Sequence, residues 1–273
     1  MRVETLHIQN PLDIEAIRDR LSTQTVGRRI ALYQEIPSTN AALRDLTRAG
    51  APEGTVVVAE GQTAGRGGRG SPGSPPPGVN LYASVLFRPA IPPRAAQVFS
   101  FIASLALTDA IRGLGLWVGI KWPNDILVNR KKVAGMLAEL ATLGDRVEYV
   151  ILGVGVNLNV EREALLGALG EAGRWATSLR EALGRPIDRN AFAAEYLNAL
   201  DRWLAVFEEQ GEAALLRAWA DRDILTGRRV EVREEGGSLD GRVVGVDAEG
   251  HLQVADSLGR VHRVVAGEVR VVE

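Results

Sequence analysis

A segment rich in glycine and arginine holds residues that could bind an anion. It reads Gly65-Arg66-Gly67-Gly68-Arg69-Gly70, so it carries two guanidinium groups on a backbone with few side chains. Glycines leave main-chain N–H groups free to converge on an anion, and arginine donates bidentate hydrogen bonds to phosphate or carboxylate. The pattern predicts a phosphate-handling loop, although a Gly/Arg/Pro linker has the same composition. It is neither a Walker loop nor a dinucleotide fingerprint, because no Lys-Ser/Thr follows and the glycine spacing differs.

A second segment whose residues could take part in binding or catalysis is Gly119-Ile120-Lys121-Trp122-Pro123-Asn124-Asp125. Lys121 lies on a predicted strand in an apolar setting, where an ammonium group needs an anionic partner. That partner is either a ligand or a carboxylate such as Asp125. Asn124 and Asp125 are also ordinary turn residues. Asn157 lies between apolar neighbours and needs hydrogen bonds if buried, and those could be purely structural.

Composition excludes several other chemistries. The chain has 273 residues, a formal charge of −2 and no cysteine, so disulfides, thiolate metal sites and cysteine nucleophiles are ruled out. A near-balanced charge does not favour a nucleic-acid binder or a polybasic membrane anchor. Residues 1–10 lack the pattern of a secretory signal, and the apolar run 98–111 is expected to be too short and too polar to cross a membrane. We therefore expect a cytoplasmic protein.

Hydrophobic periodicity then predicts the elements that must position these residues. Helices are expected at 12–21, 41–46 (with an N-cap signal at Ser38-Thr39-Asn40), 92–114, 188–210 and 211–221. Strands are expected at 29–34, 55–59, 81–87, 118–122, 125–128 and 132–140, with a hairpin turn at Asn129-Arg130 and a pair of strands within 147–160.

The C-terminal part changes character. Short β-branched strands are expected at 229–232, 241–246, 251–255, 261–265 and 269–272, separated by glycine-containing turns. Several short strands at this spacing predict a small barrel. We predict a catalytic domain over residues 1–222 and a barrel domain over residues 223–273. The thirty-odd residues before Ser38 are too few for a helix-turn-helix, so no DNA-binding domain is expected there.

Taken together and in order, six blocks resemble the biotin–protein ligase family. They are Ser38-Thr39-Asn40, Gln62-Thr63-Ala64-Gly65-Arg66-Gly67, Asn80-Leu81-Tyr82, Lys121-Trp122-Pro123-Asn124-Asp125, Lys132-Val133-Ala134-Gly135-Met136-Leu137 and Gly153-Val154-Gly155-Val156-Asn157-Leu158-Asn159. The resemblance covers the chain from about Ile30 onward and includes Ala176-Thr177-Ser178-Leu179. It implies an α+β fold, in which a mixed β-sheet backed by helices precedes a small SH3-like β-barrel.

The resemblance also implies roles for individual residues. Biotin would be bound by Ser38, Thr39, Asn40, Gln62, Gly65, Arg66, Gly67, Gly68 and Lys121. The adenylate would be bound by Arg69, Asn124, Lys132 and Asn157, with Lys121 and Arg66 as the catalytic residues. Hydroxyl and amide side chains suit a ureido ring, which offers N–H donors and a carbonyl acceptor.

The implied reaction has two steps. The biotin carboxylate attacks the α-phosphate of ATP, and a lysine of a biotin carboxyl carrier domain then displaces AMP. Several anionic groups must meet, so positive charge and positioning are required, and a Mg²⁺ ion is expected with ATP. No nucleophile–base triad is evident, and His7, His251 and His262 lie outside all six blocks.

Two departures from the family pattern lie in the loop. Gly68 stands where the family usually has a second arginine, and Ser71-Pro72-Gly73-Ser74 stands where it usually carries a tryptophan. The first departure predicts an adenylate that escapes more readily, with Arg69 as a partial substitute. The second leaves the packing of adenine or of the loop as an open question.

Three other functional interpretations compete with a biotin–protein ligase. A lipoate–protein ligase shares the chemistry, but the KWPND block and the C-terminal barrel favour biotin. A non-catalytic biotin-binding or regulatory module would have less need of Arg66 and Lys121. An ordinary nucleotide-binding protein requires the order of the motifs to be coincidence. Members of the family often pair through a sheet edge, so a homodimer is one expected arrangement, while DNA and membrane partners are not expected.

Overall fold

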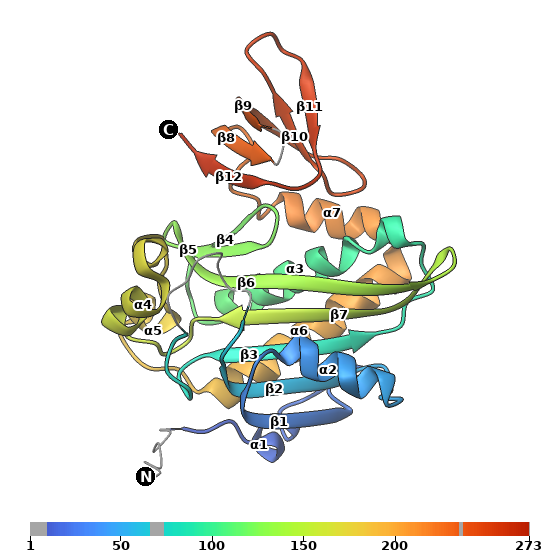
Figure 1. Ribbon diagram of the computed structural model, residues 1–273, viewed down its shortest axis with the longest axis vertical. Helices are drawn as coiled ribbons and strands as arrows, with labels where there is room; N and C mark the ends of the chain where they lie inside the picture. The colour runs from blue at the N-terminus through green and yellow to red at the C-terminus, as the bar shows by residue number, and fades with distance from the viewer. Residues whose placement is uncertain (1–9, 66–73, 235–236, 273) are drawn as a thin grey trace.

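The computed structural model describes residues 10–65, 74–234 and 237–272 and contains two β-sheets (Figure 1). The larger has seven strands in the order β1-β2-β3-β7-β6-β5-β4, and the smaller has five in the order β11-β10-β9-β8-β12. The predicted fold class is confirmed: a mixed sheet backed by helices precedes a small antiparallel unit.

The seven-stranded sheet is mixed because its first two strands are parallel. Strand β1 (Arg29–Ile36) pairs in parallel with β2 (Thr55–Gln62), and α2 (Thr39–Arg48) connects them. All other neighbours are antiparallel: β2 with β3 (Leu81–Phe87), β3 with β7 (Arg146–Val156), β7 with β6 (Lys131–Leu143), β6 with β5 (Asp125–Val128), and β5 with β4 (Val118–Lys121).

One face of this sheet is covered by helices that form the main core. The apolar helix α3 (Val98–Arg112) follows a short 3₁₀ turn (Pro93–Ala95), and α6 (Arg189–Gln210) and α7 (Glu212–Ala220) pack beside it (Figure 1). Helix α1 (Ile14–Arg18) lies against α6 and β1. The opposite face carries α2, as Figure 1 shows, and only a small cluster of Leu43, Ala51, Val57, Leu86 and Ile151 is buried beneath that helix.

Contrary to the expectation for the run 98–111, the longer segment Pro93–Arg112 that contains it is long and apolar enough, by length and composition, to cross a membrane. However, 72% of its most apolar window is buried inside the protein. A core helix of a folded protein passes the same test, and the packing of α3 against α6 and the sheet accounts for its composition.

Several predicted elements differ from those observed. The pair of strands expected within 147–160 is a single strand, β7, because Gly153 and Gly155 continue the extended pairing with β6 rather than breaking it. Helices α4 (Arg162–Leu169) and α5 (Leu179–Leu183) and the 3₁₀ segment Gly170–Trp175 were not predicted. The hairpin turn at Asn129-Arg130 is confirmed, and both residues have positive φ, as such two-residue turns require.

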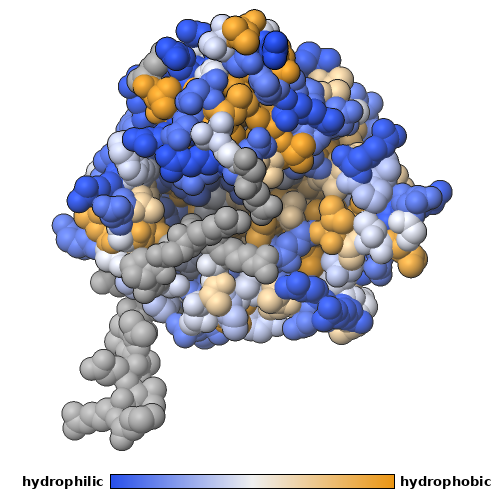
Figure 2. Space-filling model, turned by 45° about the horizontal axis from the view of Figure 1, so that its top comes forward, coloured by the Kyte–Doolittle hydropathy of each residue, from blue (hydrophilic) through white to orange (hydrophobic). Residues whose placement is uncertain are grey.

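The C-terminal unit is an antiparallel sheet of β8 (Arg229–Glu234), β9 (Gly237–Val246), β10 (Leu252–Ala255), β11 (Val261–Val264) and β12 (Glu268–Val271). Its buried side chains, among them Val230, Val243 and Leu252, join the main core. Some apolar residues of this unit, such as Leu258 and Val265, are exposed to solvent. Figure 2 shows hydrophobic patches, in orange, among hydrophilic residues on the surface. The predicted domain division at Asp223 falls between α7 and β8.

Candidate functional site

The centre of the α2 side of the sheet is a floor made of glycines. Tyr82 on β3 pairs with Gly155 on β7, Gly155 pairs with Gly135 on β6, and Gly135 pairs with Asp125 on β5. Lys121 on β4 pairs with Asp125 and completes the row. Residues directly opposite one another on neighbouring strands share a face. The row therefore places two adjacent glycines, Gly155 and Gly135, which we call the glycine floor, next to the charged residues Asp125 and Lys121.

A second row on the same face carries polar side chains. Ser84 on β3 pairs with Gly153 on β7, and Asn40 of α2 lies over Gly153, so closely that a Cβ atom there would collide with the Asn40 amide. The Ser84 Oγ lies 2.6 Å from Asn40 Oδ1 and 2.8 Å from Thr39 Oγ1. Gly153 thus lets the start of α2 approach the sheet and brings three polar side chains together.

The start of α2 is bound to the end of β2. Ser38 is the N-cap residue, as the sequence predicts, but its side chain makes no capping hydrogen bond. The backbone N–H of Thr39 instead donates to Gln62 Oε1 at 2.7 Å, and the Thr39 hydroxyl lies 3.0 Å from the same oxygen. A Cβ atom on Gly65 would lie 2.9 Å from Gln62 Nε2. Four of the predicted biotin residues, Ser38, Thr39, Asn40 and Gln62, are therefore neighbours.

Lys121 and Lys132 lie at the charged end of the floor in different environments. Asp125 forms an ion pair with Lys132, whose Nζ lies 2.5 Å from Asp125 Oδ1. The alternative in which Asp125 neutralises Lys121 is therefore wrong, and Lys121 has no charged partner among the described residues. A Cβ atom on Gly135 would lie 3.3 Å from Lys132 Nζ, so Lys132 crosses the glycine floor. The absence of a side chain at Gly135 leaves room for that ammonium group.

Asn124 and Asn157 have structural hydrogen bonds at the edge of the floor. Asn124 Nδ2 donates to the Met136 carbonyl at 2.8 Å, and Asn157 Nδ2 donates to the Thr177 carbonyl at 3.1 Å. Each amide oxygen lacks a hydrogen-bond partner in the described part of the chain. The predicted adenylate roles thus require those oxygens, since the amide nitrogens already hold the backbone.

Four predicted residues, Arg66, Gly67, Gly68 and Arg69, lie outside the described residues. The roles assigned to that loop, and the consequences of Gly68, stay predictions. The described residues on either side place its ends: Gly65 adjoins Gln62, and Pro77 packs on Gly61 at the end of β2.

Ser84, Tyr82 and Trp175 were missed as candidate functional residues. A serine in the otherwise apolar strand Leu81–Phe87 was the available signal for Ser84. Burial raises the pKa of Tyr82, and the hydrogen bond from Asn80 offsets this only in part, so the phenol stays protonated at neutral pH. Trp175 is 75% exposed and precedes Ala176, whose backbone forms an isolated parallel β-bridge with that of Lys132. No sequence pattern indicated that contact.

A buried ion pair beneath β2 was also missed. Glu60 and Arg189 are fully buried, with Arg189 Nη2 2.8 Å from Glu60 Oε2. Arg189 also donates to the backbone carbonyls of Asn80 and Asn10. The pair lies on the core face of the sheet. Through its hydrogen bond to the Asn80 carbonyl, Arg189 holds the segment before β3 from that face.

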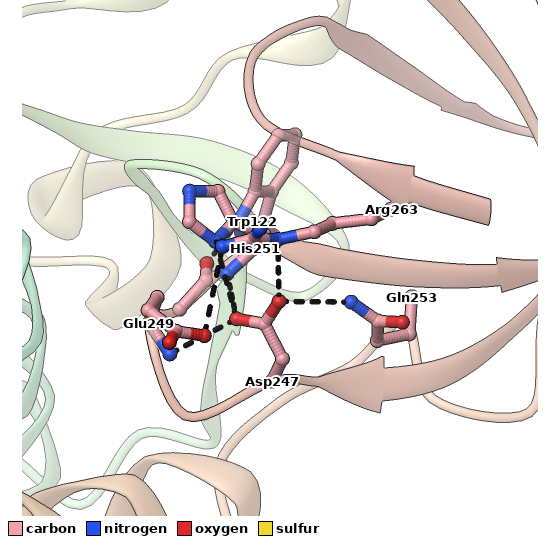
Figure 3. A network of polar contacts seen from close by, with 7 residues as sticks. Trp122, Asp247, Glu249, His251, Gln253 and Arg263 are labelled. Atoms are coloured by element: carbon pink, nitrogen blue, oxygen red, sulfur yellow. Dashed lines mark hydrogen bonds and ion pairs between the residues drawn. The ribbon is translucent and has the colours of Figure 1, made fainter.

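Carboxylates that could bind a cation lie at two places. On the floor, Asp125 could supply one carboxylate oxygen, which suits a Mg²⁺ ion held mainly by nucleotide phosphates and water. Elsewhere, Asp247, Glu249 and His251 cluster in the turn between β9 and β10 (Figure 3). There Arg263 Nε already lies 2.8 Å from Asp247 Oδ2 and supplies the positive charge.

Family models match both units of the chain. Residues 32–157 match the Biotin/lipoate A/B protein ligase family, and residues 225–271 match the biotin protein ligase C terminal domain. The first match contains the floor and the start of α2. Together they define a ligase of the biotin/lipoate class that carries the C-terminal domain of biotin protein ligases.

Curated relatives narrow the class. The chain is 33% identical over 270 residues to the biotin--[acetyl-CoA-carboxylase] ligase of Mycobacterium tuberculosis, and the alignment covers 96% of each chain. It is 31% identical over 256 residues to the bifunctional ligase/repressor BirA of Bacillus spizizenii, covering 93% of this chain and 78% of that one. The chain therefore belongs to the biotin protein ligase family of enzymes.

Solved structures show the same fold. The biotin protein ligase of Aquifex aeolicus in complex with biotin and ATP superposes with a TM-score of 0.73 at 26% identity. The match covers 89% of this chain and 98% of that one.

Proposed function

We propose that this enzyme activates biotin with ATP to biotinyl-5′-AMP and transfers biotin to a lysine of a biotin carboxyl carrier domain. The observation that carries the proposal is the glycine floor of Gly135 and Gly155, with a hydrogen-bonding group at one end and Lys121 and Lys132 at the other. A flat bicyclic ligand with a polar ring at one end and a carboxylate at the other fits this distribution.

The polar end suits the ureido ring. Thr39, Asn40, Gln62 and Ser84 offer hydroxyl and amide groups that can donate and accept. Gln62 Nε2 has no hydrogen-bond partner among the described residues and can donate to the ureido carbonyl. From Gly153 on β7 to Asp125 on β5 is two strand spacings, about 10 Å, so a ligand with an extended acid chain can reach the lysines.

The charged end suits adenylation. A carboxylate oxygen of biotin attacks the α-phosphorus of ATP, the bond to the β-phosphate oxygen breaks, and pyrophosphate leaves. Lys121 has no competing carboxylate in the described part of the chain, so its charge can be shared between the biotin carboxylate and the α-phosphate. Lys132, held over the floor by Asp125, supplies a second cation. We assign it a role in adenylate formation as well as in adenylate binding. Arg66 and Arg69 would add charge from the loop.

Transfer follows on the same floor. The carrier lysine, as the neutral amine, attacks the acyl carbonyl and loses a proton, and AMP leaves with the former carboxylate oxygen. Mg²⁺ would enter with ATP and neutralise phosphate charge. The adenine base would lie near Asn157 and the exposed Trp175, whose indole ring offers a stacking surface beside Lys132.

A mass-spectrometric acceptor assay tests the proposal. The enzyme is mixed with ATP, Mg²⁺, biotin and a biotin carrier domain, with lipoate and a lipoyl domain in parallel. Biotin on the target lysine of the carrier is expected, and Lys121→Ala should abolish it. Lipoate transfer alone, or biotin binding without any transfer, would refute the proposed reaction. Biotin on many lysines would indicate an escaping adenylate, as Gly68 predicts.

We further propose that the enzyme works in the cytoplasm and pairs as a homodimer. The linker residue Asp223 forms a backbone β-bridge with Ile120, so it covers the β4 edge of the sheet. The other edge strand, β1, pairs only with β2 in the described chain and leaves that edge open. Backbone groups on an open edge can pair with a second copy. Sedimentation velocity at micromolar concentration should show a dimer, and a monomer at all concentrations would refute this.

A further inference from the structure

The turn between β9 and β10 contacts the catalytic domain at the residue that follows Lys121. Trp122 is 2% exposed, and its only polar side-chain atom, Nε1, donates to the Gly250 carbonyl at 3.0 Å (Figure 3). Gly250 has a φ of +82° and lies so close to Phe101 of α3 that a Cβ atom would collide with that ring. The turn is therefore seated between Trp122 and α3.

The position of the Gly250 carbonyl is set by a network around Asp247. Its Oδ1 accepts from the backbone N–H groups of Glu249 and His251, at 3.0 and 2.9 Å. Its Oδ2 lies 2.8 Å from Arg263 Nε, and Gln253 donates to it at 3.1 Å (Figure 3). Burial raises the pKa of Asp247, but the contacts with His251 and Arg263 outweigh burial and hold the pKa below its ordinary value. The carboxylate stays ionised at neutral pH and keeps the turn rigid.

A second turn of the same design shows that the contact is not required by the turn itself. Between β10 and β11, Asp256 Oδ1 accepts from the N–H groups of Leu258 and Arg260, as Asp247 does in the first turn. Gly259 has a φ of +78°, close to that of Gly250, but nothing lies near its Cβ position. The two turns differ in their surroundings, and only the first lies against Trp122.

The strand that carries Lys121 is also held by the chain leading to the C-terminal unit. The Ile120 N–H donates to the Arg222 carbonyl at 2.8 Å, and the Ile224 N–H donates to the Ile120 carbonyl at 3.0 Å. Arg222 in turn pairs with Asp109 of α3 at 2.7 Å. Residues on both sides of Lys121 are therefore fixed by segments that follow α7.

We propose that Trp122 is a positioning residue, held by the β9–β10 turn, that sets the place of Lys121 and Asp125 for biotin adenylation. Trp122 directly follows the last residue of β4 and is buried in the main core, whereas Lys121 is only partly buried, so Trp122 anchors from the core side the backbone that presents Lys121 on the site side. The C-terminal unit is then part of the support of the active site. This inference rests on the proposed function, because it takes adenylation as the reaction that Lys121 serves.

The matched variants are Gly250→Ala and Gly259→Ala in the full-length enzyme. Both place a Cβ at a positive φ, so they share the backbone strain, but only Gly250→Ala forces the turn away from Trp122. Pyrophosphate release with biotin, ATP and the carrier domain, which allows repeated turnover, is measured well below the melting temperature. We expect Gly250→Ala to lower kcat about tenfold, or about 1.36 kcal/mol, because small displacements of positioned groups slow catalysis. Gly259→Ala should stay within about twofold.

Trp122→Phe removes the N–H donor and keeps a ring in the core. It should lower kcat to a similar extent, and the double variant Trp122→Phe/Gly250→Ala should be no slower than the slower single one, because both open the same contact. KM for the carrier domain should not change in any variant. Equal kcat for Gly250→Ala and Gly259→Ala, or effects of Trp122→Phe and Gly250→Ala that multiply, would overturn the proposal.

Exchange of the Trp122 indole N–H with solvent, followed by NMR and assigned by its loss in Trp122→Phe, needs no activity. Gly250→Ala should speed exchange at least about tenfold and Gly259→Ala should not. A wild-type enzyme that makes no adenylate would refute the proposed function, whereas the exchange rates would still test the contact. If Gly250→Ala does not fold, Trp122→Phe alone decides: unchanged kcat overturns the proposal.

Discussion

The two faces of the seven-stranded sheet carry side chains of opposite kinds. Along β7, Val150, Leu152, Val154 and Val156 point to the helix side and are buried in the main core. On the other face the same strand presents Ile151, then Gly153 and Gly155. The first face gains its free energy by burying apolar side chains. The second face lacks such side chains at Gly153 and Gly155, where we propose that biotin binds.

Charged residues follow the same division. On the core face Glu60 and Arg189 are fully buried and neutralise each other's charge. On the site face Lys121 has no charged partner in the described chain, although Asp125 lies opposite. The buried charges of the core face are neutralised within the fold, whereas Lys121, to which we assign a role in catalysis, has no such partner in the described chain.

The largest expected effect is on the core face. Arg189→Met should lower the free energy of unfolding by about 3 to 5 kcal/mol, because Glu60 is left buried without its partner. Urea denaturation measures the change. Glu60→Gln/Arg189→Met should recover part of the loss, and a double variant as unstable as the single one would contradict this account.

Lys121→Ala should show the opposite behaviour. Adenylate formation should fall by about 10² to 10³, the effect of removing one preorganised electrostatic group. The free energy of unfolding should change by less than about 0.5 kcal/mol, as for other substitutions away from packed or paired groups. Lys131→Ala is the control, since Lys131 pairs at 3.9 Å with Glu181 rather than facing the floor. A large loss of stability in Lys121→Ala would indicate a structural ion pair.

Gly155→Val tests the floor directly. A Cβ atom there would lie 3.7 Å from Tyr82, an ordinary contact, so the fold should tolerate it while the side chain occupies the ligand's place. The Kd for biotin should rise by about tenfold to a hundredfold, or about 1.4 to 2.8 kcal/mol, in isothermal titration.

Leu152→Ala, on the opposite face of the same strand, should cost about 2 to 5 kcal/mol of stability with an unchanged Kd for biotin. If Gly155→Val bound biotin normally, the floor would not be the biotin site.

The smallest expected effect concerns the start of α2. Thr39→Val removes the hydroxyl that lies 3.0 Å from Gln62 and 2.8 Å from Ser84. Losing a hydrogen bond of this kind costs about 1 kcal/mol, so the Kd for biotin should rise about fivefold. Thr47→Val is the control, because Thr47 bonds within α2, to the Leu43 carbonyl. Equal Kd values for the two variants would remove Thr39 from the biotin site.

Much of the fold and part of the site could be predicted from local pattern. Strand Leu81–Phe87, strand Asp125–Val128 and the Asn129-Arg130 turn were predicted with their observed bounds, because alternation and turn preference act over a few residues. The grouping of Ser38, Thr39, Asn40 and Gln62 followed from the family resemblance, and the structure brings them together.

The sequence by itself determined which residues could bind anions, where most of the strands lie and that no thiol chemistry is available. Only the tertiary structure decided that Asp125 pairs with Lys132, that Gly153 admits Asn40 and that Gly250 receives the Trp122 indole. Each of these contacts depends on strand register or on the seating of one unit against another. Such contacts join residues far apart in the chain, and the local sequence carries no information about their distance.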